Sequence, residues 1–304
     1  MKWEKLGLVF RPSGENESLQ SHGSMPLSYH IGGDRFRFYF SSRDSNNSSA
    51  INYVEVNIDK PSEILFLSNE PVLRKGPYGH FDDNGLYSGS LIKYRDKLYM
   101  FYSGRSNGVD NLYYMNIGLA VSENNGLKFK RVMNHPILSR SEYDPWLVTA
   151  PSVYEKDKVF NMIYTSGTKI FNDGTSNYDL KLAKSDDFYN WKSTGEKVIS
   201  LEKGESNISA PCVVKYGDKF HIWFSIKPNK GEYRIGYASS VDGNTWHRDD
   251  NCMGLNIGES KFDNQAVSYP NLFCHKNFIY MLYSGNNNGL EGFGIARTEL
   301  TNLI

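Results

Sequence analysis

The sequence has few cysteines and no long hydrophobic run. Its three cysteines, Cys212, Cys252 and Cys274, are odd in number and show no CxxC spacing, which argues against a disulfide framework and a zinc site. No apolar run approaches the roughly 18 residues that a membrane-spanning helix needs. The first residues, MKWEKLGLVF, lack the apolar region and cleavage site of a signal peptide. We therefore expect a cytoplasmic protein without a membrane span.

The sequence also lacks an excess of charge of either sign. Its 34 basic residues balance 34 acidic ones, whereas nucleic-acid and anionic-membrane binding both need a basic surface, so we expect neither partner. The glycine-rich segment GLEGFG (289–294) lies between two expected strands and opens no helix, which excludes a dinucleotide site. We expect no GxSxG nucleophile elbow, which needs a strand-to-helix turn, and no His/Cys/Asp cluster has metal spacing. We expect neither a cofactor nor a metal, and the oligomeric state is left open.

What the sequence does contain is a repeat. The segments LYMFYSG (98–104) and IYMLYSG (279–285) are nearly identical, and weaker copies read FRFYFSS (36–42), NMIYTSG (161–167) and HIWFSIK (221–227). Their central aromatic residues are spaced by 63, 62, 60 and 59 positions, so five copies fill the 304-residue chain. A fixed period of this length is typical of a repeat architecture. The aligned residues are Tyr39, Tyr102, Tyr164, Phe224 and Tyr283.

Each copy reads as four short strands. In the third copy, segments 150–156, 159–167 and 178–185 are apolar or alternate with period two, and a last strand follows Trp191. Between the third and fourth strands, SENNGLKF (122–129), SDDFYNW (185–191) and SVDGNTW (240–246) resemble the Asp-box hairpin, whose side chain caps its own turn. No segment has a convincing helical stripe of apolar residues, so we expect little helix.

Five units of four strands predict an all-β fold, a five-bladed β-propeller with four-stranded blades. The last unit stops after three strands, and residues 2–10 look like its missing fourth strand, with Trp3 in the position of Trp191 and Trp246. The N-terminal strand would then close the ring and remove an exposed sheet edge. We expect a single domain over residues 1–304.

Three aspartates recur before the expected inner strands, which converge on the centre of a propeller. Asp82, Asp144 and Asp263 each follow an aromatic residue and stand seven positions before the proline or glycine of such a strand. They could supply the acid and base of glycoside hydrolysis. A residue that recurs in equivalent positions more often has a structural role, such as capping a turn, and we favour that interpretation.

Residues that break the repeat are better candidates for chemistry. Arg43 and Arg105 could bind a substrate carboxylate or phosphate, or could pair with the nearby Asp44 or Asp110. For His22, an ordinary hydrogen-bonded histidine is favoured over a metal ligand. The other candidates are the acids Asp83 and Glu205, the amide of Asn286, and the aromatic residues Trp146 and Tyr269, which suit stacking on a sugar ring.

The YMxYSG second strands and the IGxAxSxDG turns resemble the five-bladed propeller glycosidases, a group that includes arabinanases, invertases, levansucrases and mannoside phosphorylases. The end of the chain, YPNLF to GFGIA (269–296), is similar to uncharacterised bacterial propeller proteins. The resemblance implies an Asp base and a Glu acid beside the inner-strand prolines of the first and fourth blades. Met25 and Ser209–Ala210 occupy those positions here, and none of them transfers a proton usefully. The invertase signature, which belongs near the N-terminus, is absent as well. The string most similar to it, FDDNG (81–85), lies in the second unit.

The leading hypothesis is a carbohydrate-active enzyme of glycosidase-like fold that hydrolyses or transfers a glycosyl unit at the central funnel with relocated carboxylates. The alternatives are a sugar-binding propeller without catalysis and a glycosyltransferase for a charged or nucleotide-linked sugar. The expected partner is a carbohydrate or sugar-containing small molecule. The catalytic candidates are Asp83, Asp144, Asp263 and Glu205, and the substrate-binding candidates are His22, Arg43, Arg105, Trp146, Ser209, Tyr269 and Asn286.

Overall fold

The chain folds almost entirely into β-strands. The computed structural model describes residues 3–108, 113–171 and 174–303. In these residues the helices are only α1 (Asp250–Met253), α2 (Asn286–Gly289) and the 3-10 helix η1 (Leu300–Leu303). The prediction of an all-β chain with little helix is confirmed. None of the described helices has the length and apolar character needed to cross a membrane.

The first half of the chain forms two antiparallel four-stranded sheets, each built from consecutive strands. The middle strands of each sheet are buried on both faces along most of their length, and tight turns fix the register. The first sheet contains β2 (Ser21–Gly32), β3 (Arg35–Arg43), β4 (Ser49–Asn57) and β5 (Ile64–Leu67); the second contains β6 (Gly85–Tyr94), β7 (Lys97–Asn107), β8 (Tyr113–Ser122) and β9 (Lys130–Arg131).

The next eight strands form one sheet that a single parallel pair, Tyr178 with Asn207, holds together. On either side of that pair lie two antiparallel sets of four strands. The first set contains β10 (Leu147–Lys156), β11 (Val159–Ile170), β12 (Ser176–Ser185) and β13 (Lys192–Ile199); the second contains β14 (Glu205–Tyr216), β15 (Lys219–Pro228), β16 (Arg234–Ser240) and β17 (His247–Arg248).

The last sheet joins the two ends of the chain. Its strands β18 (Ser268–His275), β19 (Phe278–Ser284) and β20 (Phe293–Glu299) are consecutive, and β1 (Glu4–Phe10) pairs with β20 as the fourth strand. Trp3, just before β1, is buried against Trp223, and its Nε1 donates to the carbonyl of Met253 at 3.0 Å. The predicted pairing of the N-terminal strand with the last unit is therefore present.

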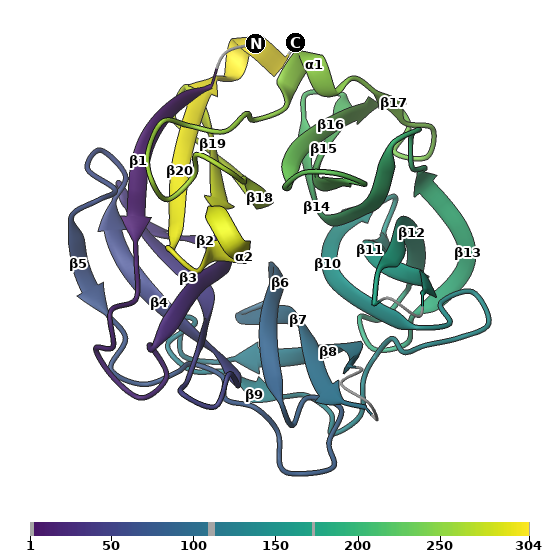
Figure 1. Cartoon of the computed structure of the whole chain (residues 1–304), viewed down its shortest axis with the longest axis horizontal. Coiled ribbons are helices and arrows are strands. Elements are labelled where there is room, and N and C mark those ends of the chain that lie inside the picture. The colour runs from purple at the N-terminus through teal and green to yellow at the C-terminus, as the bar shows by residue number, and fades with distance from the viewer. Residues whose placement is uncertain (1–2, 109–112, 172–173, 304) are drawn as a thin grey trace.

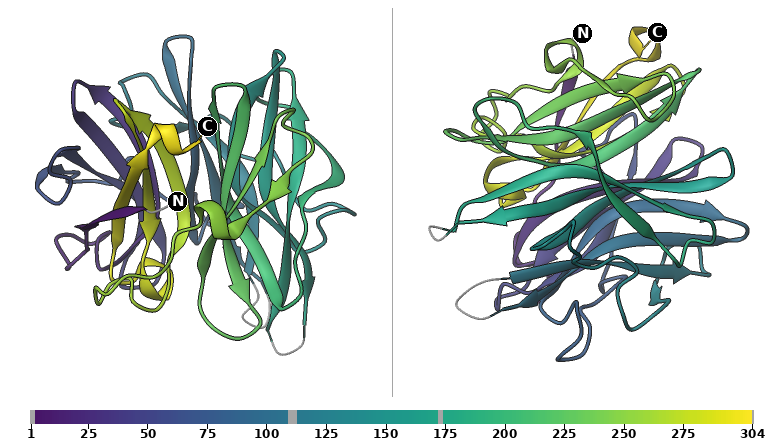
Figure 2. Two further views of the ribbon diagram at one scale, coloured as in Figure 1. Left: turned by 90° about the horizontal axis from the view of Figure 1, so that it is seen from above. Right: turned by 90° about the vertical axis from the view of Figure 1, so that its right-hand side faces the viewer.

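The sheets are arranged around a common centre (Figure 1). The first strand of each unit lies innermost, and β2 contacts β6 and β18, while β10 contacts β6 and β14 and β14 contacts β18. Figure 2 shows that the strands run between the two faces of this arrangement, so the hairpin turns lie on those faces. Side chains at the ends of the inner strands consequently meet at the centre.

The innermost strand of each unit has an irregular backbone where it reaches the centre of the ring. In four strands the residue before the proline has a positive φ, 51° at Met25, 48° at Ala150 and Ala210, and 55° at Tyr269, a conformation that is costly for residues with a side chain. A hydroxyl from the neighbouring unit accepts the backbone N–H at this point. The five bonds are Ser88 to Ser41, Ala150 to Ser103, Ala210 to Thr165, Tyr269 to Ser225 and Met25 to Ser284, between 2.8 and 3.1 Å.

These five bonds explain the repeated motif in the sequence. The accepting residue is a serine or threonine in every unit. It directly follows the aligned aromatic residue of the repeat in units two to five, and it stands two positions after that residue in the first unit. Because the hydroxyl satisfies a buried N–H that the strand ladder leaves unpaired, its loss would carry a desolvation cost.

The turns that resemble Asp-box hairpins have the predicted capping geometry. Asp187 Oδ1 accepts the backbone N–H groups of Tyr189 and Asn190, and Asp242 Oδ1 accepts those of Asn244 and Thr245, all at 2.8–2.9 Å. These aspartates therefore cap turns, as their recurrence predicted.

Candidate functional site

A pocket of about 300 Å³ lies where the inner strands meet, a volume at the lower end of the range for small-molecule sites. The floor of this pocket is formed by the four positive-φ residues that precede the prolines of the inner strands. These residues separate the pocket from a small void beneath it. Hydroxyls, phenols and two arginines form most of the wall. The lining residues are Ser24, Met25, Arg43, Tyr87, Arg105, Tyr113, Met115, Leu147, Thr149, Ala150, Thr165, Tyr178, Ser209, Ala210, Tyr233, Tyr269 and Asn288.

One side of the pocket is an aromatic wall. Tyr113 and Tyr178 lie hydroxyl to hydroxyl at 3.2 Å, and the indole of Trp146 packs behind both rings with centroid distances of 5.5 and 5.7 Å. The Trp146 Nε1 donates to the carbonyl of Tyr113 at 3.2 Å. The guanidinium of Arg105 lies 5.4 Å from the Tyr113 ring centroid, within range of a cation–π contact.

The tyrosines of the pocket stay protonated at neutral pH. Burial raises the pKa of Tyr233 to about 12 and the pKa values of Tyr178 and Tyr269 well above their ordinary value. Each therefore presents a phenol O–H and not a phenolate. This arrangement suits hydrogen bonding to a ligand and does not favour a tyrosine nucleophile or base.

The structure brings four of the predicted substrate-binding residues into the central pocket: Arg43, Arg105, Ser209 and Tyr269. His22 lies close to Arg43 without lining the pocket, and its Nδ1 is 2.9 Å from the hydroxyl of Ser21. Burial and the charge of Arg43 lower the pKa of His22 to about 4, so the imidazole is neutral at pH 7. This is the ordinary hydrogen-bonded histidine that the sequence favoured.

The other two substrate-binding predictions lie outside the pocket lining. Trp146 is covered by Tyr113 and Tyr178, so a ligand would meet those rings and not the indole. Asn286 is buried, and its Oδ1 accepts the N–H groups of Gln265 and Ala266 while its Nδ2 donates to the carbonyl of Lys261. The amide is thus engaged within the fold.

The three recurrent aspartates lie in the turns before β6, β10 and β18, outside the lining of the central pocket. Each accepts a hydrogen bond from the buried tyrosine of a second strand and pairs with a cation from the third or fourth strand of its unit. Tyr102 donates to Asp82, Tyr164 to Asp144 and Tyr283 to Asp263, at 3.0–3.1 Å. The paired cations are Arg131 at 2.7 Å from Asp82, Lys181 at 3.3 Å from Asp144 and Lys5 at 2.6 Å from Asp263.

This tyrosine–aspartate–cation contact supports the structural interpretation of the recurrent acids. Asp82, Asp144 and Asp263 are at most 1% exposed, so a substrate does not reach them in this conformation. The catalytic roles of Asp144 and Asp263 stay predictions from the sequence.

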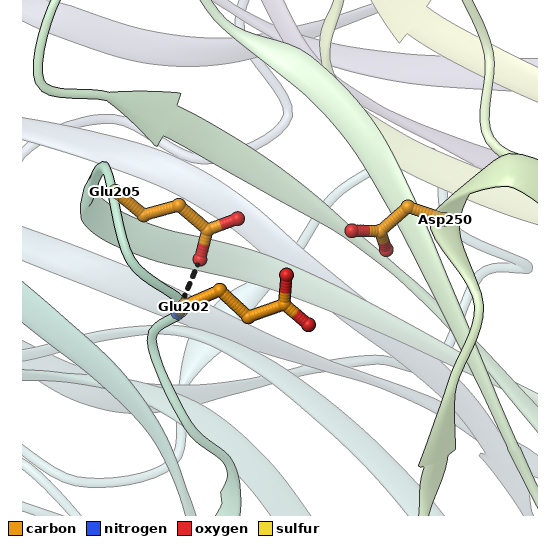
Figure 3. A group of neighbouring side chains, drawn as sticks. All are labelled: Glu202, Glu205 and Asp250. Atoms are coloured by element: carbon orange, nitrogen blue, oxygen red, sulfur yellow. Dashed lines mark hydrogen bonds between the residues drawn. The ribbon is translucent and has the colours of Figure 1, made fainter.

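Glu205 belongs to an acidic cluster at the start of β14. Figure 3 shows Glu202, Glu205 and Asp250, whose carboxylate oxygens lie within 4.8 Å of one another, close enough to share a cation. The guanidinium of Arg248 already lies among them, with Nη2 2.7 Å from Asp250 and Nη1 3.0 Å from Glu205. A metal ion would have to displace this arginine, so the cluster is explained by the ion pairs it makes.

Asp83 lines a different, larger pocket of about 920 Å³. This second pocket lies on the other side of the β7–β8 hairpin, since Ser106 and Tyr114 face it while their neighbours Arg105 and Tyr113 face the central pocket. Asp83 is half-buried, and its Oδ2 accepts the N–H of Gly79 at 2.8 Å. Of the four predicted catalytic acids, Asp83 lines this second pocket, and none of the four lines the central pocket.

The sequence did not identify the phenols that form most of the central wall, Tyr87, Tyr113, Tyr178 and Tyr233. Three of them share a signal, because Tyr113, Tyr178 and Tyr233 stand at or near the start of the third strand in consecutive units. A search for aromatic residues near the start of each third strand would have found these three tyrosines.

Comparisons with known proteins agree with this architecture. The family model of the glycosyl hydrolases family 32 N-terminal domain matches residues 64–212. The Mycobacterium tuberculosis protein named "Uncharacterized protein MT1551" is 35% identical over 98% of this chain and 100% of its own length.

Among solved structures, a glycoside hydrolase superposes with a TM-score of 0.77 at 19% identity, covering 97% of this chain and 91% of its own. A thermostable family-43 glycoside hydrolase superposes with a TM-score of 0.65 at 16% identity, covering 92% and 89%. At such low identity these structures establish the fold alone. The chain belongs to the same family as MT1551, and it shares the fold of these glycoside hydrolases.

Proposed function

We propose that this protein is a five-bladed β-propeller that binds a carbohydrate or sugar-containing small molecule in its central pocket. One observation carries the proposal. The pocket combines aromatic rings and hydroxyl groups, and none of the Asp and Glu residues in the described part of the chain lines it. Aromatic faces pack on the C–H groups of a sugar, and hydroxyls and phenols bond to its oxygens. Binding is thus better supported than hydrolysis by a carboxylate pair.

The ring itself is part of this proposal. The chain has five sets of four strands, and a backbone N–H of each set donates to a hydroxyl of the neighbouring set. These five equivalent bonds support a closed propeller that forms one domain over the whole chain. The bond from Met25 to Ser284 is the one that links the last unit to the first. Closure matters for function because the pocket wall is shared among all five units.

The proposal is tested by measuring ligand binding at Tyr269. We expect Tyr269→Ala to weaken the binding of a sugar ligand roughly tenfold, because it removes an aromatic face and a phenol from the pocket. The variant should fold, since Ala150 and Ala210 occupy the equivalent positions of two other inner strands with the same positive φ. Tyr189→Ala, at an exposed tyrosine outside the pocket, is the control.

Isothermal titration calorimetry with a panel of neutral and acidic mono- and oligosaccharides gives the measurement. Binding to the wild-type protein that Tyr269→Ala weakens and Tyr189→Ala leaves unchanged supports the proposal. Equal affinities for both variants would place the ligand elsewhere and overturn it.

Glycosyl hydrolysis or transfer is the second candidate, and Asp83 is the observation that favours it. This carboxylate lines the larger pocket together with His80 and Arg140, so it can reach a bound substrate. If Asp83 is a general acid or base, Asp83→Asn should lower turnover of an aryl glycoside by about 100-fold or more. Asp59→Asn, on an exposed turn, is the control. Unchanged turnover in Asp83→Asn would remove Asp83 from the mechanism.

A further inference from the structure

Two arginines of the central pocket have no carboxylate partner among the described residues. Arg43 donates to the side-chain oxygen of Asn47 at 2.8 Å, and Arg105 lies over the ring of Tyr113. Neither takes part in an ion pair within residues 3–108, 113–171 and 174–303. In addition, the Nε of Arg105 is buried and has no hydrogen-bond partner among these residues. Both guanidinium groups therefore retain unused donors.

Three other arginines with little exposure are paired with a carboxylate. Arg37 lies 2.7 Å from Glu55, Arg131 lies 2.7 Å from Asp82, and Arg248 lies 2.7 Å from Asp250. An uncompensated charge in a low-dielectric site is costly, which explains these pairs. The two pocket arginines differ from these three, because no carboxylate of the described residues pairs with them.

The sequence left open whether Arg43 pairs with Asp44 and Arg105 with Asp110. Asp44 caps the turn that follows β3, because its Oδ1 accepts the N–H groups of Asn46 and Ser48 at 2.9 and 2.8 Å. It makes no ion pair with Arg43 in the described structure. Asp110 lies outside the described residues.

The remaining polar groups of the wall strengthen the positive character of the pocket. The phenols of Tyr178 and Tyr233 stay protonated and so can donate hydrogen bonds, whereas the hydroxyl of Tyr269 already donates to Asn288 Oδ1 at 3.0 Å. The positive charge of Arg43 also acts on His22, whose pKa is lowered to about 4 by burial and by that charge. A pocket with cations and O–H donors and no carboxylate in its described lining is complementary to a ligand that carries negative charge and many acceptors.

We propose that the ligand of the central pocket is an acidic sugar, whose carboxylate or phosphate group is bound by Arg43 and Arg105. This inference rests on the proposed carbohydrate function and names its substrate class. The two arginines come from the ends of β3 and β7, so adjacent units of the ring share the acidic group. Charge-assisted bonds from guanidinium to such oxyanions are about twice as strong as neutral hydrogen bonds.

The test compares matched ligands on the intact protein by isothermal titration calorimetry. The probes are glucuronic acid and glucose 1-phosphate, with glucose as the neutral partner and inorganic phosphate as the acid group alone. We expect one or both acidic sugars to bind at least about tenfold more tightly than glucose, with an affinity that falls as salt is raised. Preference for glucuronic acid identifies a carboxylate ligand, and preference for glucose 1-phosphate identifies a phosphate ligand; either supports the inference.

Three variants locate the acid group. Arg43→Gln and Arg105→Gln should each weaken the acidic sugar by about tenfold or more and leave glucose nearly unchanged. Arg95→Gln is the matched control, because Arg95 is exposed, lies over the ring of Tyr94 at 5.3 Å and lines neither of the two pockets. Thermal unfolding of each variant confirms that it is folded.

The outcomes separate the two proposals. Glucose bound as tightly as the acidic sugars, with no effect of either arginine variant, would overturn the acidic ligand and leave the carbohydrate function in place. Inorganic phosphate bound as tightly as glucose 1-phosphate, with both arginine variants weakening it, would support an anion site and overturn the sugar. No binding of any probe or of the wider sugar panel would overturn the carbohydrate function itself.

Discussion

The buried ion pair between Lys5 and Asp263 gives a quantitative test of how the N-terminal strand is held. Lys5 lies on β1, and its Nζ is 2.6 Å from Asp263 Oδ2, which also accepts the hydroxyl of Tyr283 at 3.0 Å. Asp263 is 1% exposed, so water does not replace a lost partner. Removing one member of a buried pair leaves the other charge uncompensated, which costs about 3–5 kcal/mol. We expect Lys5→Met to lower the free energy of unfolding by that amount.

The assay is urea unfolding followed by tryptophan fluorescence, and the design is a double-mutant cycle. In Lys5→Met/Asp263→Asn no buried charge is left, so the double variant should be more stable than the sum of the two single effects predicts, by roughly 0.5–3 kcal/mol. Lys60→Met removes an exposed pair with Glu63 and should change the free energy by no more than about 1 kcal/mol.

Two results would refute this reasoning. One is a Lys5→Met variant as stable as Lys60→Met, which would mean that β1 is not held by the pair. The other is strict additivity in the double variant, because it would show that the two side chains do not interact. If Asp263→Asn instead retained full stability and lost an enzymatic activity, the aspartate would have the catalytic role predicted from the sequence.

Two further predictions concern stability. Ser284→Ala leaves the buried N–H of Met25 without its acceptor and should lower the free energy of unfolding by about 1–3 kcal/mol. Ser268→Ala removes a buried hydroxyl that has no hydrogen-bond partner among the described residues and should cost less. Equal effects of the two variants in chemical denaturation would contradict the importance of the bond from Met25 to Ser284. Burial lowers the pKa of His221 to about 4, so the unfolded chain binds more protons between pH 4 and 6.5, and stability should fall as pH is lowered through that range. His221→Phe, which can still pack on Trp223, should flatten this part of the stability profile, and an unchanged slope would exclude His221 as its cause.

Much of the fold could be predicted from the sequence because the repeat aligns five weak strand patterns. The expected strands at 150–156, 159–167 and 178–185 correspond to β10, β11 and β12, which begin or end at most three residues away. The N-terminal strand was placed correctly because the last unit was one strand short and Trp3 matched the tryptophans of other units. Blade count and ring closure need spatial relations between units, which the pattern along the chain implies only indirectly.

The candidate site was less accessible to sequence reasoning. Arg43, Arg105 and Tyr269 were found because they interrupt the repeat, and interruption is visible in one dimension. The pocket phenols were not found, because the chain has 21 tyrosines and most positions suit a β-sheet equally well. Trp146 was predicted from its residue type to stack on a sugar ring, but it is covered by two tyrosines that come from β8 and β12.

The floor of the pocket has a consequence for how members of this fold diversify. The residues that precede the prolines are fixed through their backbone N–H groups, so their side chains are free to differ, as the methionine, two alanines and tyrosine at these positions do. Positive φ disfavours β-branched residues there, which leaves a restricted set of replacements. New ligand preferences can therefore arise by substituting a few residues of the pocket floor, without a change in the surrounding β-sheets.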